Sequence, residues 1–145
     1  MSAGSGASSL VFIDTNIWLY AFSQTQDIQK AHRARALIRG TSPIVLSTQV
    51  INEVAVNLLH KFQAAESDIR KLIRSFYRKY LIIEHNRAIL LHASDIRTMY
   101  QVSYWDSLIL SSALAAGATI LYTEDMHEGL MIANKLTIVN PLKDS

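Results

Sequence analysis

The stretch Val11-Phe12-Ile13-Asp14-Thr15-Asn16 decides how the rest of the chain is interpreted. An apolar β-forming run ends on an acid, and a helical pattern over residues 17–22 begins at once. This order is typical of a strand that leads into a helix. In open α/β sheets, ligands bind in the crevice outside the carboxyl ends of the strands. Asp14 is therefore predicted to lie at the mouth of a site.

The composition is that of a globular protein. The chain has 145 residues, of which 50% are hydrophobic and 18% charged, and this size suits one domain. It contains no cysteine, which excludes disulfides, thiolate metal sites and cysteine nucleophiles. The net charge of +2 is too small to indicate nucleic-acid binding by itself.

The chain is expected to divide into a short tail and one domain. Residues 1–9 are small and polar and are expected to form a flexible tail, whereas residues 10–145 are expected to form a single domain. No apolar run approaches the roughly 18 residues of a membrane span, so we expect a cytoplasmic protein without membrane contact.

Apolar runs alternate with amphipathic stretches along the chain. Helical periodicity covers residues 27–39, 48–62, 67–78, 86–100 and 103–116, while strands are predicted at 44–46, 80–83, 118–122 and 136–139. Gly40 and Gly117 are expected to end the helices that precede them. Strands separated by helices predict an α/β fold: a central, mostly parallel sheet of about five strands with helices on both faces.

Each acid that could form a site also has an ordinary structural explanation. Asp14 could cap the following helix, because Asp is a favoured N-cap residue. Glu53 could be a solvated residue at the edge of a helix. Asp106 fits a capping box with Ser103, although it lies on an otherwise apolar helix where an unpaired carboxylate is costly.

The predicted positions of the acids favour a shared site over separate structural roles. Asp14 and Asp125 follow strands, and Glu53 and Asp106 lie in the N-terminal halves of helices that can reach the same rim. Carboxylates about 4 Å apart repel by about 4 kcal/mol at an effective dielectric constant near 20, so a cluster either raises its members' pKa values or binds a cation. Oxygen ligands favour Mg²⁺ or Mn²⁺, which can activate water for in-line attack at phosphorus.

Four short motifs in this order resemble PIN-domain ribonucleases. They are Ile13-Asp14-Thr15-Asn16, Ser47-Thr48-Gln49-Val50-Ile51-Asn52-Glu53, Trp105-Asp106-Ser107-Leu108-Ile109 and Thr123-Glu124-Asp125. The end of the chain, over residues 124–129 and 138–141, is similar to the VapC-type toxins of bacterial toxin–antitoxin pairs. The resemblance extends from residue 11 to residue 141.

The resemblance implies a PIN-like three-layer fold and a metal-dependent endoribonuclease. Asp14, Glu53, Asp106 and Asp125 would be the acidic quartet that holds Mg²⁺ or Mn²⁺. Asn16 and Thr123 match family positions that hydrogen-bond the acids. Of the two adjacent acids, Asp125 aligns better with the metal ligand, and Glu124 would be a supporting residue beside the ligands. The family further implies an RNA substrate, a homodimer and inhibition by a small VapB-like antitoxin.

Two other interpretations stay open: a non-catalytic PIN-like module that binds RNA or protein, and a housekeeping PIN nuclease without an antitoxin. A phosphatase of the haloacid-dehalogenase type is disfavoured, because Asn16 stands where its second aspartate belongs. The basic stripe Arg70, Lys71, Arg74 and Arg78 suits a solvated face better than a phosphate-binding surface. Trp105 is expected to be an ordinary packing residue rather than one that excludes water from the site.

Overall fold

The computed structural model describes residues 9–22 and 27–143, and places six strands and six helices there. Most of the predicted tail, residues 1–8, lies outside the described residues. The strands are β1 (Val11–Ile13), β2 (Ile44–Ser47), β3 (Leu81–Ile83), β4 (Ile120–Tyr122), β5 (Met131–Ile132) and β6 (Leu136–Val139). The helices are α1 (Thr15–Phe22), α2 (Ile28–Gly40), α3 (Thr48–Lys61), α4 (Glu66–Lys79), α5 (Arg87–Met99) and α6 (Tyr104–Ala115).

The strands form one sheet in the order β3-β2-β1-β4-β6-β5. Every pair is parallel except β5 with β6, so the prediction of a mostly parallel sheet is confirmed. The additional strand is β5, whose two residues are too few to show a periodic pattern. It pairs with β6 through a turn in which Ala133 and Asn134 both have positive φ.

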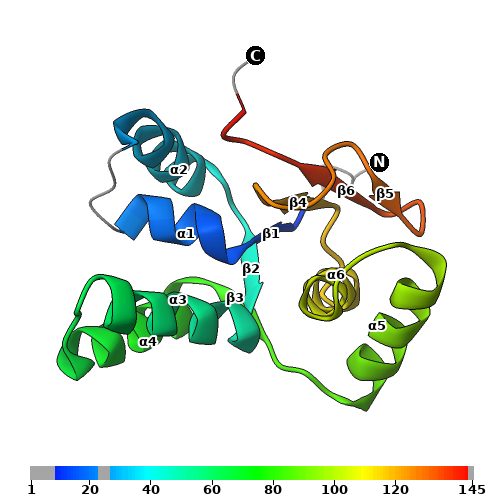
Figure 1. Ribbon diagram of the computed structural model, residues 1–145, viewed down its shortest axis with the longest axis horizontal. Helices are drawn as coiled ribbons and strands as arrows, with labels where there is room; N and C mark the ends of the chain where they lie inside the picture. Colours follow the sequence, from blue (N-terminus) through cyan, green and yellow to red (C-terminus); the bar gives the residue numbers. More distant parts are fainter. Residues whose placement is uncertain (1–8, 23–26, 144–145) are drawn as a thin grey trace, which may run out of the picture.

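Helices cover both faces of the sheet, as predicted (Figure 1). The chain moves from β1 to β2 and β3 in one direction across the sheet, and returns to β4 in the other. Because parallel crossovers are right-handed, this reversal places α1 to α4 on one face and α5 with α6 on the opposite face. In the described part of the chain, no helix has the length and apolar character that crossing a bilayer requires.

Helix α1 is fastened to the sheet by Trp18. This side chain is fully buried and its ring contacts the rings of Phe22, Phe76 and Tyr80, which joins α1 to α4. The indole N–H also donates to the carbonyl of Ile13, with an N···O distance of 3.0 Å. Ile13 is the last residue of β1 and directly precedes Asp14. The packing of α1 therefore also fixes the backbone next to the first predicted acid.

The last long helix, α6, is buried on most sides, as its apolar composition predicts. Ser103 caps its N-terminus by accepting the N–H of Asp106 at 3.1 Å. Gly117, at φ +82°, ends it in the left-handed conformation that favours glycine. Gly40 also ends its helix as predicted, because it is the last residue of α2. Thr41 follows with an extended backbone, so this helix ends without a left-handed glycine.

Candidate functional site

The direction of the sheet order changes between β1 and β4, which lie side by side. Asp14 follows β1, and Thr123, Glu124 and Asp125 follow β4. The Asp14 N–H donates to the carbonyl of Tyr122 at 3.0 Å, so the parallel pairing continues up to the acid. In open α/β sheets such a reversal leaves a crevice at the carboxyl ends of the strands.

A cavity of about 240 Å³, which we call the acid cavity, opens at this position and is lined by all four predicted acids. Asp14 comes from the end of β1, Glu53 from α3, Asp106 from the first turn of α6 and Asp125 from the loop after β4. The remaining wall consists of Thr15, Asn16, Leu19, Gln49, Asn57, Trp105 and Ile109. The fold thus brings together four carboxylates from separate elements.

Asp14 is the most buried of the four acids, with 7% of its surface exposed. One carboxylate oxygen accepts the N–H of Thr15 at 2.7 Å, and the other accepts the hydroxyl of Thr123 at 2.8 Å. An N-cap carboxylate instead accepts from the second or third residue of its helix. The hydrogen bonds of the Asp14 carboxylate are therefore not those of a helix N-cap.

The acids disfavour one another's charged forms. Burial raises the pKa of Asp14 to about 6, its two hydrogen bonds oppose this rise, and the charges of Glu53 and Asp106 add to it. Burial also raises the pKa values of Glu53 and Asp106, and repulsion from Asp125 adds to both. A cation in the acid cavity would relieve this repulsion.

Glu53 is held by hydroxyl and amide groups. Thr15 Oγ1 donates to Glu53 Oε1 at 3.2 Å, and Gln49 Nε2 approaches the same oxygen at 3.4 Å. Sequence reasoning missed Gln49 and Asn57 as wall residues. Their spacing of four residues on either side of Glu53 was the available signal, because residues four apart share a helix face.

The predicted supporting residues behave differently from one another. Thr123 forms the predicted bond to Asp14, and its Oγ1 also accepts the N–H of Asp125 at 3.3 Å, so one hydroxyl links two acids. Asn16 lines the acid cavity, but its Oδ1 and Nδ2 are buried without a hydrogen-bond partner. The bond from Asn16 to the acids that the resemblance implied is therefore not formed.

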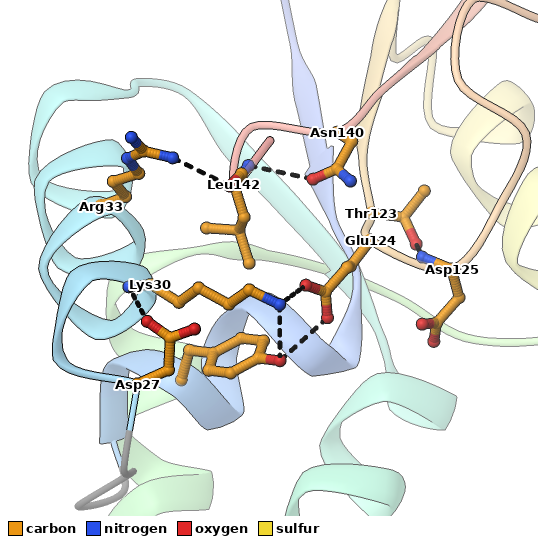
Figure 2. Close-up of polar contacts among 9 residues, drawn as sticks. Asp27, Lys30, Arg33, Thr123, Glu124, Asp125, Asn140 and Leu142 are labelled. Atoms are coloured by element: carbon orange, nitrogen blue, oxygen red, sulfur yellow. Dashed lines mark hydrogen bonds and ion pairs between the residues drawn. The ribbon is translucent and has the colours of Figure 1, made fainter. Parts of the chain in front are cut away.

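Glu124 turns to the other side of the loop, as Figure 2 shows. Its carboxylate forms an ion pair with Lys30 and accepts the hydroxyl of Tyr20 at 3.0 Å, whereas the Asp125 carboxylate lies apart from that pair. Glu124 is not a wall residue of the acid cavity. Of the two adjacent acids, Asp125 is thus the one that lies with Asp14.

The basic side chains of α2 and of the predicted stripe on α4 differ in their surroundings. Lys30 binds Glu124, and Arg33 and Arg35 donate to the carbonyls of Leu142 and Ala21. The stripe on α4 is exposed at every position, which agrees with a solvated face; its members are Arg70, Lys71, Arg74 and Arg78. The expectation that Trp105 packs is wrong, because 61% of its surface is exposed.

The donor set of the acid cavity fits a hard divalent cation. Carboxylate oxygens are the preferred ligands of Mg²⁺ and Mn²⁺. The buried amide of Asn16 has no hydrogen-bond partner, and a water molecule bound to such an ion could provide one. In the described part of the chain, however, no three Asp, Glu or His side chains already surround one cation position. The four carboxylates line a common cavity without converging on a single point.

Comparisons with known proteins agree with this architecture. The family model described as PIN domain matches residues 11–127. No curated protein matches the sequence. Solved structures with the same fold include a toxin–antitoxin complex from Klebsiella pneumoniae, at 20% identity and a TM-score of 0.68, which covers 90% of this chain and 97% of that one.

Two further neighbours have comparable likeness. VapC20 of Mycobacterium tuberculosis, described as a sarcin–ricin loop cleaving toxin, has 17% identity and a TM-score of 0.65, and covers 79% of this chain and 89% of that one. VapBC2 from Rickettsia felis, bound to a promoter DNA fragment, has 21% identity and a TM-score of 0.62, with coverage of 90% and 99%. At these identities the likeness shows the fold alone, whereas the family match covers most of the sequence. The chain belongs to the PIN domain family.

Proposed function

We propose that the protein is a metal-dependent endoribonuclease that hydrolyses RNA phosphodiester bonds at the acid cavity. The observation that carries the proposal is the meeting of Asp14, Glu53, Asp106 and Asp125 in the wall of one cavity. Phosphodiester hydrolysis needs a positive centre beside the phosphate, and repelling carboxylates of raised pKa are suited to hold one. We assign the four acids as ligands of Mg²⁺ or Mn²⁺.

A divalent ion bound there would lower the pKa of water and neutralise charge that builds on the phosphate. The protein's residues prepare the site for it. Thr123 and the Thr15 N–H hold the two oxygens of Asp14, and Thr15 Oγ1 holds Glu53. Groups fixed in this way lose less freedom when they bind an ion, which is how such outer contacts tune affinity. The unpaired amide of Asn16 is placed to orient water or a phosphate oxygen.

We further propose that this nuclease is the toxin of a VapBC-type pair. Support comes from its structural neighbours, among them the Klebsiella toxin–antitoxin complex and the toxin VapC20. On this proposal the protein binds a small VapB-like antitoxin and acts as a homodimer in the cytoplasm. Co-expression with the adjacent reading frame would test it: a small partner should co-purify and suppress RNA cleavage.

The test of the nuclease proposal is cleavage of single-stranded RNA by the purified chain with Mn²⁺ or excess EDTA. We expect cleavage with Mn²⁺ alone, and its loss in Asp14→Asn and Asp106→Asn proteins that remain folded. Asp95→Asn, an exposed substitution of the same kind on α5, should leave cleavage unchanged. Equal cleavage in EDTA, or in both cavity variants, would refute the metal mechanism. A protein that binds RNA without cutting it would favour the non-catalytic module.

A further inference from the structure

A second cavity lies beside the acid cavity, and we call it the base cavity. Its volume is about 380 Å³, and its walls are Thr48, Gln49, Asn52, Glu53, His85 and Trp105. Gln49, Glu53 and Trp105 also line the acid cavity, so the two cavities adjoin along these three residues. A strand whose phosphate lies at the carboxylates would therefore have a neighbouring group close to the base cavity.

Trp105 presents a large aromatic surface at this position. The side chain is 61% exposed, and Tyr104 beside it is 53% exposed. The two rings meet edge to face at 5.2 Å and 79°, and the Arg97 guanidinium lies 4.4 Å from the centre of the Tyr104 ring. These contacts hold the indole from one side and leave much of it open. Exposed aromatic rings next to a backbone-binding site are the usual stacking platforms for single-stranded nucleic acid.

Gln49 supplies a hydrogen-bonding group in the same wall. It is only 8% exposed, and its Nε2 lies 3.3 Å from the Trp105 carbonyl and 3.4 Å from Glu53 Oε1. These contacts orient the amide and leave Gln49 Oε1 buried without a partner within the described residues. Nε2 of His85, in the same wall, is likewise buried and unpartnered. Buried polar atoms normally have partners, so these two point to a ligand.

We propose that the base cavity binds one nucleobase of the RNA strand, stacked on Trp105 and donating an N–H to Gln49 Oε1. This inference rests on the proposed ribonuclease function, because the phosphate next to that nucleobase would lie at the acid cavity. Every nucleobase offers a flat face for stacking and an N–H for the amide oxygen. The base cavity therefore positions the strand for cleavage, and His85 and Asn52 are placed to discriminate between bases.

The test is RNA binding by proteins that all carry Asp14→Asn, which blocks cleavage under the proposed function. Fluorescence anisotropy would compare an intact labelled oligoribonucleotide with a series in which one abasic nucleotide moves along the strand. At one position the missing base should weaken binding about tenfold or more, the range of base–aromatic stacking. Adding Trp105→Ala should abolish that position's effect, and Trp105→Phe should restore it. Tyr77→Ala, an exposed aromatic control on α4, should change nothing.

Several results would overturn the inference. The abasic series could affect the Trp105→Ala protein as much as its parent, or the parent could fail to bind RNA. Trp105→Ala could instead alter the sedimentation coefficient while RNA binding stays constant, which would assign the indole to a protein contact. Failure of the nuclease proposal is distinguishable: the unsubstituted protein would not cleave RNA with Mn²⁺, yet the abasic pattern would persist and support the base cavity.

Discussion

Replacing Asp14 by asparagine should stabilise the metal-free protein at neutral pH. Burial raises the pKa of this carboxyl group from 3.8 to about 6, so the native state holds a proton that the unfolded chain releases between these values. The free energy of unfolding therefore falls as pH rises through this window, and stays lowered above it. At 1.36 kcal/mol per pH unit, the difference amounts to about 3 kcal/mol.

The side-chain amide introduced by Asp14→Asn avoids this cost but changes the hydrogen bonds to Thr15 and Thr123, a loss of about 1 kcal/mol. We expect the variant to be about 2 kcal/mol more stable than the unsubstituted protein at pH 7.5 and about 0.5 kcal/mol less stable at pH 4. Urea unfolding in EDTA at the two pH values measures this difference. Carboxylates that titrate equally in both proteins cancel from it.

Asp95→Asn is the matched control, because Asp95 is exposed on α5. Its effect on the free energy of unfolding should be small at both pH values. If Asp14→Asn has the same effect at pH 4 as at pH 7.5, or destabilises the protein at both, then burial of the ionised Asp14 carboxylate does not destabilise the protein at neutral pH.

Metal affinity, the two adjacent loop acids and the packing of α1 provide three more tests. Mn²⁺ affinity, measured by calorimetry, should fall about tenfold per pH unit below pH 6, because protonation of Asp14 competes with the ion; a flat profile would contradict its role as a ligand. RNA cleavage should survive Glu124→Gln but not Asp125→Asn, since only Asp125 lines the acid cavity; the reverse result would exchange their roles. Trp18→Phe should lower the free energy of unfolding by about 1–3 kcal/mol in urea, because it leaves the Ile13 carbonyl without its indole donor; no change would contradict this use of Trp18.

Much of the site could be predicted because its acids sit at the ends of well-marked elements. Val11–Ile13 reads as a strand from its composition, and Asp14 follows it directly. The helix caps Ser47 and Ser103 mark where the helices carrying Glu53 and Asp106 begin. These local signals are enough to bring the acids to one edge of a parallel sheet.

The rest depends on tertiary contacts that leave no local signal. Trp is usually a highly buried residue type, yet 61% of the surface of Trp105 is exposed, and its neighbours in the sequence do not indicate this. The choice between Glu124 and Asp125 depends on Lys30, which lies on a different helix. Asn16 matches the family position, yet its buried amide makes no hydrogen bond to the acids, and this depends on side-chain placement that the motif does not encode.

Mn²⁺ binding followed by electron paramagnetic resonance at pH 7.5 tests most directly whether the acid cavity is a cation site. Binding should reduce the free-ion signal of Mn²⁺ with the unsubstituted protein and with Asp95→Asn. Asp14→Asn, Glu53→Gln, Asp106→Asn and Asp125→Asn should each weaken binding at least about tenfold, in line with the loss of a charged ligand. An unchanged free-ion signal with the unsubstituted protein, or equal binding by all four variants, would contradict the assignment of the four acids as metal ligands.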